Sequence, residues 1–222
     1  IKNDFDLKST ITCGQIFRFF IEEDGSYTVI IRDRVINLKE DNDYIIVESS
    51  KEENLKEIIY DYFDLDRDYS VIEKNILECD KKLEDALKFS RGLKMIHQDP
   101  FETIIAFIIS QRNRVPFIAK ALNLLSLNYG EKVIFKDKEY YLFPTLEQLE
   151  SVTMDLLLSA GVGFRARYLK HNIDLFVQNP NLIKSADNWK DGYQVGDVLK
   201  TAGSTAASLG TSAVKGIFGL GE

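Results

Sequence analysis

Residues 27–32 read Tyr-Thr-Val-Ile-Ile-Arg, a run of β-branched and aromatic side chains that is typical of a β-strand. Similar runs follow at residues 35–38 and 44–47, and shorter strand-like runs precede it at residues 10–13 and 16–20. Acidic and glycine-containing turns separate them. The short spacings predict an antiparallel meander, one face of which is covered by later elements.

The later part of the chain has helical periodicity. Leu55, Ile58, Ile59 and Phe63 recur at helical spacing, and the strand signal nearly disappears from about residue 90. Asp99-Pro100 is typical of a helix start, and further helices are predicted at residues 116–127, 145–149 and 154–158. A sheet followed by helices indicates the α+β class.

Composition and periodicity together divide the chain into three parts. Residues 1–90 are predicted to form the domain of antiparallel sheet and helices, and residues 91–186 an incomplete helical domain. Residues 187–222 form a Gly/Ala/Ser/Thr-rich tail with few large apolar side chains, for which we expect weak or no packing. We also expect the helix at residues 101–109 to have a poorly covered apolar face.

The overall composition excludes several classes of protein. The chain has 222 residues, of which 45% are hydrophobic and 28% charged, which excludes collagen-like, disordered and coiled-coil proteins. No apolar run is long enough for a membrane span and no leader is visible, so a cytoplasmic location is expected, with nucleoid association in a prokaryote. Only two cysteines, Cys13 and Cys79, and two histidines, His97 and His171, are present. We therefore expect no metal, no cofactor and no disulfide framework.

The net charge of −7 hides an uneven distribution. Residues 1–88 carry 13 basic and 22 acidic side chains, a net −9, whereas residues 89–171 carry 11 and 8, a net +3. Binding to nucleic acid is driven by Lys and Arg, which release counterions from phosphates. A polyanionic partner is therefore expected to bind the middle segment.

Three clusters of residues are candidates for function. Residues 110–114 (Ser-Gln-Arg-Asn-Arg) lie between two predicted helices, where they either contact DNA or form solvated surface. Residues 161–168 (Gly-Val-Gly-Phe-Arg-Ala-Arg-Tyr) either approach an anion or form an ordinary helix junction. Residues 13–18 (Cys-Gly-Gln-Ile-Phe-Arg) place a glycine in a strand-like run, which indicates a bulge or the close approach of another backbone segment or a ligand. Cys13 is expected to be a buried thiol rather than a nucleophile.

In this order, these clusters resemble the 8-oxoguanine DNA glycosylase/AP lyase family of the helix-hairpin-helix superfamily. Residues 98–102 (Gln-Asp-Pro-Phe-Glu) and Phe143-Pro144 extend the resemblance, which covers about residues 4–177. It implies a small antiparallel sheet domain and a helical domain that act on double-stranded DNA containing an oxidised purine. The lesion base is flipped out of the duplex into a protein pocket.

The resemblance implies roles for the first cluster in recognition of the lesion base. Gly14 lies where the family uses a glycine carbonyl to sense the protonated N7 that distinguishes 8-oxoguanine from guanine. Gln15 and Phe17 flank it in the same motif.

The other two clusters match positions that contact DNA and the base opposite the lesion. Arg112, Asn113 and Arg114 match an Asn-rich segment that fills the gap left by the flipped base, with arginine replacing asparagine at two of the positions. Phe164 and Arg165 match an aromatic wedge and an arginine that contacts the opposite cytosine.

Two departures from the family pattern concern chemistry and specificity. Phe117 stands where many members have a second cytosine-reading arginine. The family's later hairpin, L-P-G-V-G-x-K-x-A-D, and its V-D-x-H segment do not occur, and they supply the lysine nucleophile and the assisting aspartate. Lys184, Lys190, Lys200 and Lys215 lie in no such hairpin. We therefore assign no catalytic residue and expect a chain with slow or absent glycosylase activity.

Two alternatives to an 8-oxoguanine glycosylase stay open. One is a non-catalytic module that binds damaged DNA, and the other is an alkylpurine-type DNA glycosylase, which needs an aspartate but no lysine nucleophile. For each of them the expected partner is double-stranded DNA. A monomer is expected, with no membrane and with an unknown partner for the tail.

Overall fold

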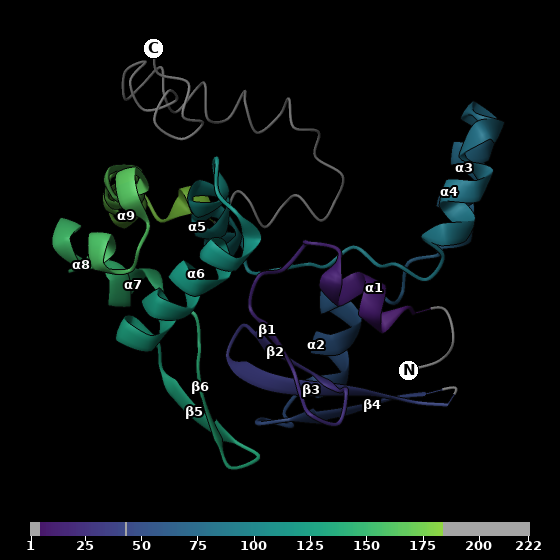
Figure 1. The fold of residues 1–222 in the computed structure, drawn as a ribbon, viewed down its shortest axis with the longest axis horizontal. Helices are drawn as coiled ribbons and strands as arrows, with labels where there is room; N and C mark the ends of the chain where they lie inside the picture. The colour runs from purple at the N-terminus through teal and green to yellow at the C-terminus, as the bar shows by residue number, and fades with distance from the viewer. Residues whose placement is uncertain (1–4, 43, 184–222) are drawn as a thin grey trace. The chain divides into compact units, whose positions relative to one another are not determined.

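The computed structural model describes residues 5–42 and 44–183 (Figure 1). These residues divide into two compact units. The first comprises residues 5–42 and 44–98 with Val133–Leu142, and the second comprises Asp99–Lys132 with residues 143–183. The predicted tail at 187–222, like Lys184, lies outside the described residues, so the structure does not bear on it.

The first unit contains the predicted antiparallel meander. Its strands lie in the order β1-β2-β3-β4, namely β1 (Phe19–Ile21), β2 (Tyr27–Ile31), β3 (Arg34–Asp41) and β4 (Tyr44–Ser49). Antiparallel pairing places Val29 opposite Ile36 and Leu38 opposite Val47. All five residues of β2 are buried, because both faces of this central strand are covered.

The predicted strand at residues 10–13 is wrong, since Leu7–Thr12 form the helix α1. The Asp6 carboxylate caps this helix, accepting hydrogen bonds from the Ser9 amide at 2.8 Å and the Ser9 hydroxyl at 2.7 Å. Leu7 and Ile11, one turn apart, are fully buried. The cap and this shared apolar face outweigh the strand propensity of the β-branched residues.

Helices cover one face of the sheet. Leu7 and Ile11 of α1 and Ile59 of α2 (Leu55–Tyr62) pack in one core with Val29 and Ile36. The remaining helices of this unit are α3 (Tyr69–Cys79), the short η1 (Lys81–Leu83) and α4 (Glu84–Phe89), which have no buried residues.

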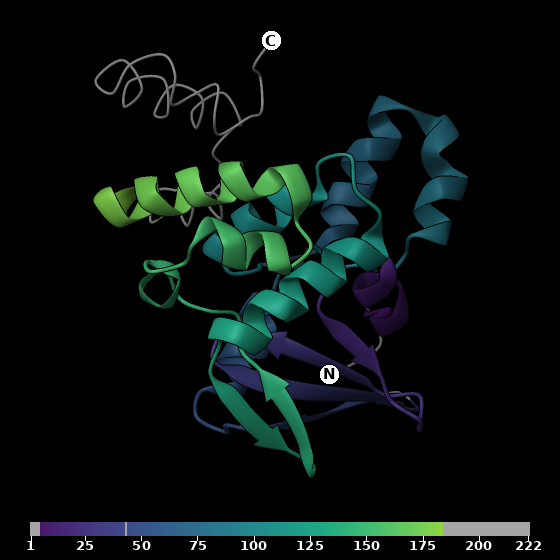
Figure 2. The same cartoon turned by 60° about the vertical axis from the view of Figure 1, so that its left-hand side comes forward.

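A hairpin from a later part of the chain covers the other face, and the sequence did not predict it. Its strands are β5 (Lys132–Phe135) and β6 (Lys138–Tyr141), which run side by side in Figure 2. Lys136 and Asp137 have φ values of 50° and 60°, the left-handed conformation that a two-residue hairpin turn requires. Tyr140 packs with Ile30 and Val35 of the sheet. The strand signal is weak because the segment has only two short runs, of four residues each.

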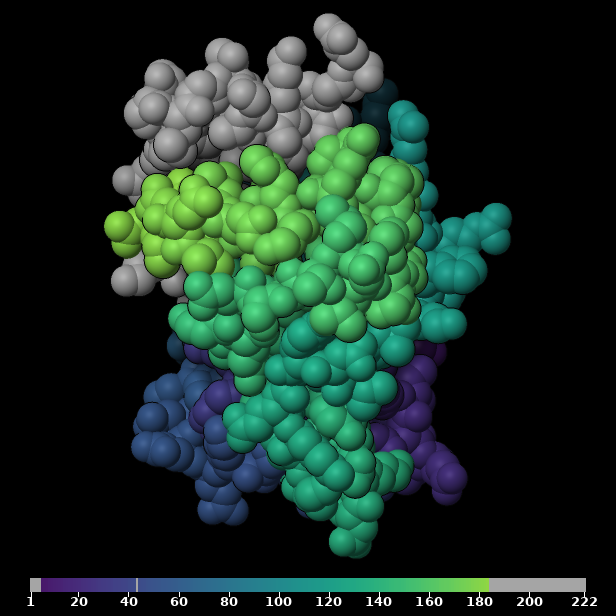
Figure 3. All heavy atoms as spheres, turned by 90° about the vertical axis from the view of Figure 1, so that its left-hand side faces the viewer, coloured from purple at the N-terminus to yellow at the C-terminus, as the bar shows by residue number. Residues whose placement is uncertain are grey.

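The second unit is helical, as predicted. Its elements are α5 (Pro100–Ser110), α6 (Val115–Tyr129), α7 (Leu146–Leu149), α8 (Met154–Ser159), η2 (Gly163–Arg165) and α9 (Ala166–Gln178). Asp99 caps α5 by accepting from the Glu102 amide at 2.9 Å, and Thr145 starts α7 with a capping box. Figure 3 shows the face where α7, α8 and α9 gather. The α+β class is thereby confirmed.

The expectation of an uncovered face on α5 is wrong for most of its apolar side chains. Phe101, Ile105, Ile108 and Ile109 are all at most 6% exposed, whereas Phe107 is 62% exposed.

Within residues 5–42 and 44–183, no helix is long and apolar enough to cross a lipid bilayer.

Candidate nucleic-acid interface

The loop that follows α1 carries Gly14, the first candidate for lesion recognition. Gly14 has a φ of +96°, which side chains other than glycine rarely adopt, and a Cβ built there meets no atom within 4 Å. It lies in an irregular, exposed loop and not inside a strand. Glycine is therefore needed here for its backbone conformation, and the space around it stays open.

The side chain of Gln15 is occupied by backbone groups. Its amide nitrogen donates to the Lys94 carbonyl at 2.8 Å, and its amide oxygen accepts from the Ile96 amide at 2.9 Å. Gln98 in turn donates through Nε2 to the Gln15 carbonyl at 2.7 Å. The side chain of Gln15 thus forms hydrogen bonds with backbone groups as a neighbouring strand would. Together with the bond from Gln98, these hydrogen bonds hold the Gly14 loop against residues 94–98.

Phe17 and Arg18, which follow Gln15, also contribute to packing and hydrogen bonding within the first unit. Phe17 is half-buried and follows the buried Ile16. Arg18 is 4% exposed and donates from Nη2 to the Tyr141 carbonyl of the β5–β6 hairpin. Cys13 is exposed, which contradicts the expectation of a buried thiol; its sulfur lies 3.3 Å from the Gln15 amide nitrogen.

In the second unit, residues 110–114 form a tight turn between α5 and α6. Arg112 has a φ of +50° in the left-handed region. The Asn113 amide group is used inside the turn, since Nδ2 donates to the Ile109 carbonyl at 3.1 Å and Oδ1 accepts from the Arg114 amide at 2.9 Å. Arg112 and Arg114 are exposed. The turn therefore exposes two cations, whereas the Asn113 side chain is hydrogen-bonded to nearby backbone groups.

Arg165 lies beneath this turn. It is 7% exposed, and Nε donates to the Gln111 carbonyl at 2.8 Å, Nη2 to the Arg112 carbonyl at 3.0 Å and Nη1 to the Val162 carbonyl at 3.4 Å. Nη2 also donates to Gln111. Phe164 is 56% exposed, and its ring centroid lies 4.5 Å from the Arg165 guanidinium carbon.

The structure therefore brings the predicted contact residues together in two groups. Arg112, Asn113, Arg114, Phe164 and Arg165 meet in the second unit, where Arg165 joins the two clusters. The Arg165 guanidinium faces carbonyl oxygens rather than solvent. Contact of Arg165 with the base opposite the lesion stays a prediction. Gly14, Gln15 and Phe17 belong to the first unit.

No pattern in the sequence indicated that Lys94 and Gln98 contribute to the first candidate site. Gln98 and Lys94 hold the Gly14 loop from about 80 positions away in the chain. Phe117, where an arginine was noted as missing, is 57% exposed on α6. No local pattern predicts pairing over such a separation.

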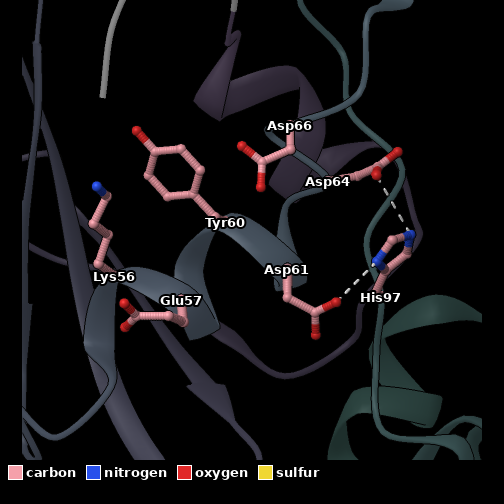
Figure 4. A pocket seen from close by; sticks show the side chains of 7 residues that line it. All are labelled: Lys56, Glu57, Tyr60, Asp61, Asp64, Asp66 and His97. Carbon is pink, nitrogen blue, oxygen red and sulfur yellow. Dashed lines mark ion pairs between the residues drawn. The ribbon is translucent and has the colours of Figure 1, made fainter.

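An acidic pocket of about 470 Å³ also lies in the first unit. Nδ1 of His97 is 3.6 Å from an Asp61 oxygen, and its Nε2 is 3.8 Å from an Asp64 oxygen (Figure 4). Arg32 and Arg67 pair with the same two carboxylates. The residues that line the pocket are mainly acidic: Lys56, Glu57, Tyr60, Asp61, Asp64, Asp66 and His97. None of the residues predicted to contact DNA or the lesion lines this pocket. Over the described ranges, no three His, Cys, Asp or Glu side chains are grouped to hold a metal ion.

Comparison with known proteins gives consistent results. Residues 1–104 match the sequence profile of the N-terminal domain of 8-oxoguanine DNA glycosylase. The N-glycosylase/DNA lyase of Saccharomyces cerevisiae is 30% identical over 184 residues, which are 76% of this chain and 48% of the yeast protein. The N-glycosylase/DNA lyase OGG1 of Arabidopsis thaliana is 23% identical over 185 residues, 80% of this chain and 50% of the plant protein. The chain thus spans about half the length of these curated relatives.

Solved structures show the same likeness. The Clostridium acetobutylicum 8-oxoguanine glycosylase/lyase, in complex with double-stranded DNA containing cytosine opposite 8-oxoguanine, matches with a TM-score of 0.75 and 36% identity. That match covers 81% of this chain and 61% of the clostridial chain. A 3-methyladenine DNA glycosylase from Archaeoglobus fulgidus matches with a TM-score of 0.58 and 19% identity, covering 71% and 58% of the two chains, a likeness of fold alone.

Proposed function

The chain belongs to the 8-oxoguanine DNA glycosylase family, and from that premise we propose that it recognises 8-oxoguanine in double-stranded DNA for base excision repair. The observation that carries this proposal is the grouping of Arg112 and Arg114, in the turn between α5 and α6, with Phe164 of η2. The two exposed cations and the exposed ring lie on segments that Arg165 joins.

Each of these side chains suits a contact with a duplex. The guanidinium groups of Arg112 and Arg114 are permanent cations with donors only, so they match phosphate oxygens and the acceptor edges of bases. Phe164 offers an apolar ring, the kind of side chain that inserts between base steps or stacks on a base. Extrusion of a base costs unstacking energy, which a wedge of this kind offsets.

Recognition of the lesion is proposed to lie with the Gly14 loop. A backbone carbonyl accepts a hydrogen bond from a protonated N7 and cannot donate to the unprotonated N7 of guanine. Such discrimination depends on the carbonyl keeping its orientation. The hydrogen bonds of Gln15 and Gln98 supply that rigidity.

The activity of the whole protein, excision of 8-oxoguanine followed by strand cleavage, is likewise a proposal from the family. We assign no nucleophile among the described residues, and Lys190, Lys200 and Lys215 lie outside them. A monomer in the cytoplasm, associated with the nucleoid if the source is a prokaryote, fits this proposal.

The test uses an end-labelled duplex with one 8-oxoguanine opposite cytosine, an undamaged duplex of the same sequence and a duplex with an alkylated purine. Binding, base release and covalent trapping by borohydride are measured together. We expect a lesion-dependent mobility shift without a trapped adduct. Release of 3-methyladenine with no preference for 8-oxoguanine would favour the alkylpurine alternative, and no DNA binding would refute the proposal.

A further inference from the structure

We propose that His97 is a positioning residue for recognition of the lesion. In its protonated form it holds residues 94–98 at the end of α2, and those residues in turn hold the Gly14 loop. The DNA-binding part of this inference rests on the proposed function. The structural part, the dependence of the loop on the charge of His97, stands without that function.

The first argument is the attachment of residues 94–98, which two sets of hydrogen bonds hold. One set joins the Gln15 side chain to the backbone at positions 94 and 96. In the other, the His97 amide donates to the Tyr62 carbonyl at 2.8 Å, at the end of α2. His97 is therefore the point at which the segment that holds the Gly14 loop is attached to α2.

The second argument is the place of the His97 ring between two carboxylates (Figure 4). Its Nδ1 is 3.6 Å from Asp61 Oδ1, and its Nε2 is 3.8 Å from Asp64 Oδ1. An imidazolium has a proton on each nitrogen and attracts both carboxylates, whereas a neutral ring directs a lone pair at one of them. Nδ1 is buried and has no hydrogen-bond partner among the described residues, so its contact with Asp61 depends on charge.

The third argument is that other groups fix both carboxylates in place. Oδ2 of Asp61 pairs with Arg32 at 2.5 Å. Oδ2 of Asp64 pairs with Arg67 at 2.5 Å and accepts from the Tyr69 hydroxyl at 2.8 Å. In each carboxylate the oxygen nearest His97 is Oδ1. The remaining charged or titratable side chains belong to the pocket or to the same segment: Lys56, Glu57, Tyr60, Asp66 and Lys94.

The charge of the surroundings favours a cation at this position. The pocket lining carries four carboxylates and one lysine, and Lys94 places its Nζ over the Tyr69 ring at 4.2 Å from the centroid. A proton on His97 therefore lowers the repulsion among the carboxylates. Loss of that proton weakens the hold of α2 on residues 94–98, and the Gly14 carbonyl loses part of its fixed orientation.

The structural part is tested by hydrogen exchange at the Ile96 amide, which donates to Gln15, as a protection factor corrected for the intrinsic effect of pH. Histidine is the side chain whose charge ordinarily changes between about pH 5 and pH 8, and the chain has two, His97 and His171. We expect the wild-type protection factor to fall about tenfold from about pH 5.5 to about pH 7.5.

Three variants separate charge from shape, each used after a cooperative melt shows that it is folded. His97→Gln has low protection at both pH values, because it carries no charge. His97→Arg has high protection at both, because its charge is permanent and its fork of donors suits two carboxylates. The matched control, His171→Gln, follows the wild type, since His171 is exposed on α9 in the second unit.

The preference for the lesion is measured at the same two pH values, as the ratio of the dissociation constants for the guanine and 8-oxoguanine duplexes. A general effect of charge on DNA binding cancels in this ratio. We expect the wild-type ratio to fall about threefold from the lower to the higher pH. The ratio stays high for His97→Arg and low for His97→Gln.

The outcomes distinguish this proposal from the proposed function. A wild-type protection factor that is independent of pH, or that changes equally in His97→Gln, would overturn the proposal. A pH-dependent protection factor with the same lesion preference in every variant would overturn the role of His97 in recognition. Should the wild-type chain bind the two duplexes equally, the proposed function fails, and the protection factors alone decide whether His97 holds the loop.

Discussion

Substitution of Gln15 by alanine tests how the Gly14 loop is held. The change removes the amide that pairs with the Lys94 carbonyl and the Ile96 amide. Lys94 and Ile96 are 6% and 8% exposed, so both backbone groups lose their partner in a mostly buried place. An unpaired buried polar group costs about 1–3 kcal/mol. Since Gln15 is half-buried and water can replace part of it, we expect a loss of about 2–4 kcal/mol.

Thermal and chemical denaturation measure this loss. For a chain of this size it corresponds to a fall in melting temperature of about 4–16 °C. Hydrogen exchange at the Ile96 amide gives a local reading, because protection there depends on the Gln15 oxygen. Thr12→Ala is the control; Thr12 is exposed, and its loss costs less than about 0.5 kcal/mol. A destabilisation by Gln15→Ala as small as that of the control, with Ile96 still protected, would refute the reasoning.

Three further predictions concern single side chains. Ile109→Ala, at a fully buried position on α5, lowers the free energy of unfolding by about 2–5 kcal/mol in a denaturant titration. Hydrogen bonds from Lys138 and Thr28 hold the pKa of Glu22 below its ordinary value of 4.5, so its stabilisation is present above pH 4.5 and lost as the pH falls through the lowered pKa. Glu22→Gln therefore flattens the acid side of a plot of melting temperature against pH. Gly14→Ala meets no steric clash but costs about 1–2 kcal/mol in backbone strain, and a filter-binding assay should show a smaller preference for 8-oxoguanine.

The sequence predicts those parts of the fold that local chemistry determines. Asp99-Pro100 and Thr145 start helices because a short side chain caps the first amides, whatever lies elsewhere in the chain. The meander at residues 27–47 follows from its β-branched runs and polar turns. At residues 7–12 the same reasoning fails, because the Asp6 cap and the burial of Leu7 and Ile11 together decide the structure.

The parts that the sequence does not predict depend on distant partners. The β5–β6 hairpin is stabilised by packing of Tyr140 on Ile30 and Val35, more than 100 residues earlier. In the candidate sites, the motifs locate Gly14 and Arg112 but not the orientation of the side chains beside them. Gln15 and Arg165 both face inward, because buried backbone groups 50 to 80 positions away need their donors.

The central claim is that the chain recognises 8-oxoguanine in duplex DNA. The ratio of the dissociation constants for two duplexes tests it most directly, one with 8-oxoguanine opposite cytosine and one with guanine at the same position, titrated at the same salt concentration. We predict that the lesion duplex binds at least about tenfold more tightly, since one hydrogen bond to a preorganised carbonyl separates the two bases. Equal constants for the two duplexes would contradict the account.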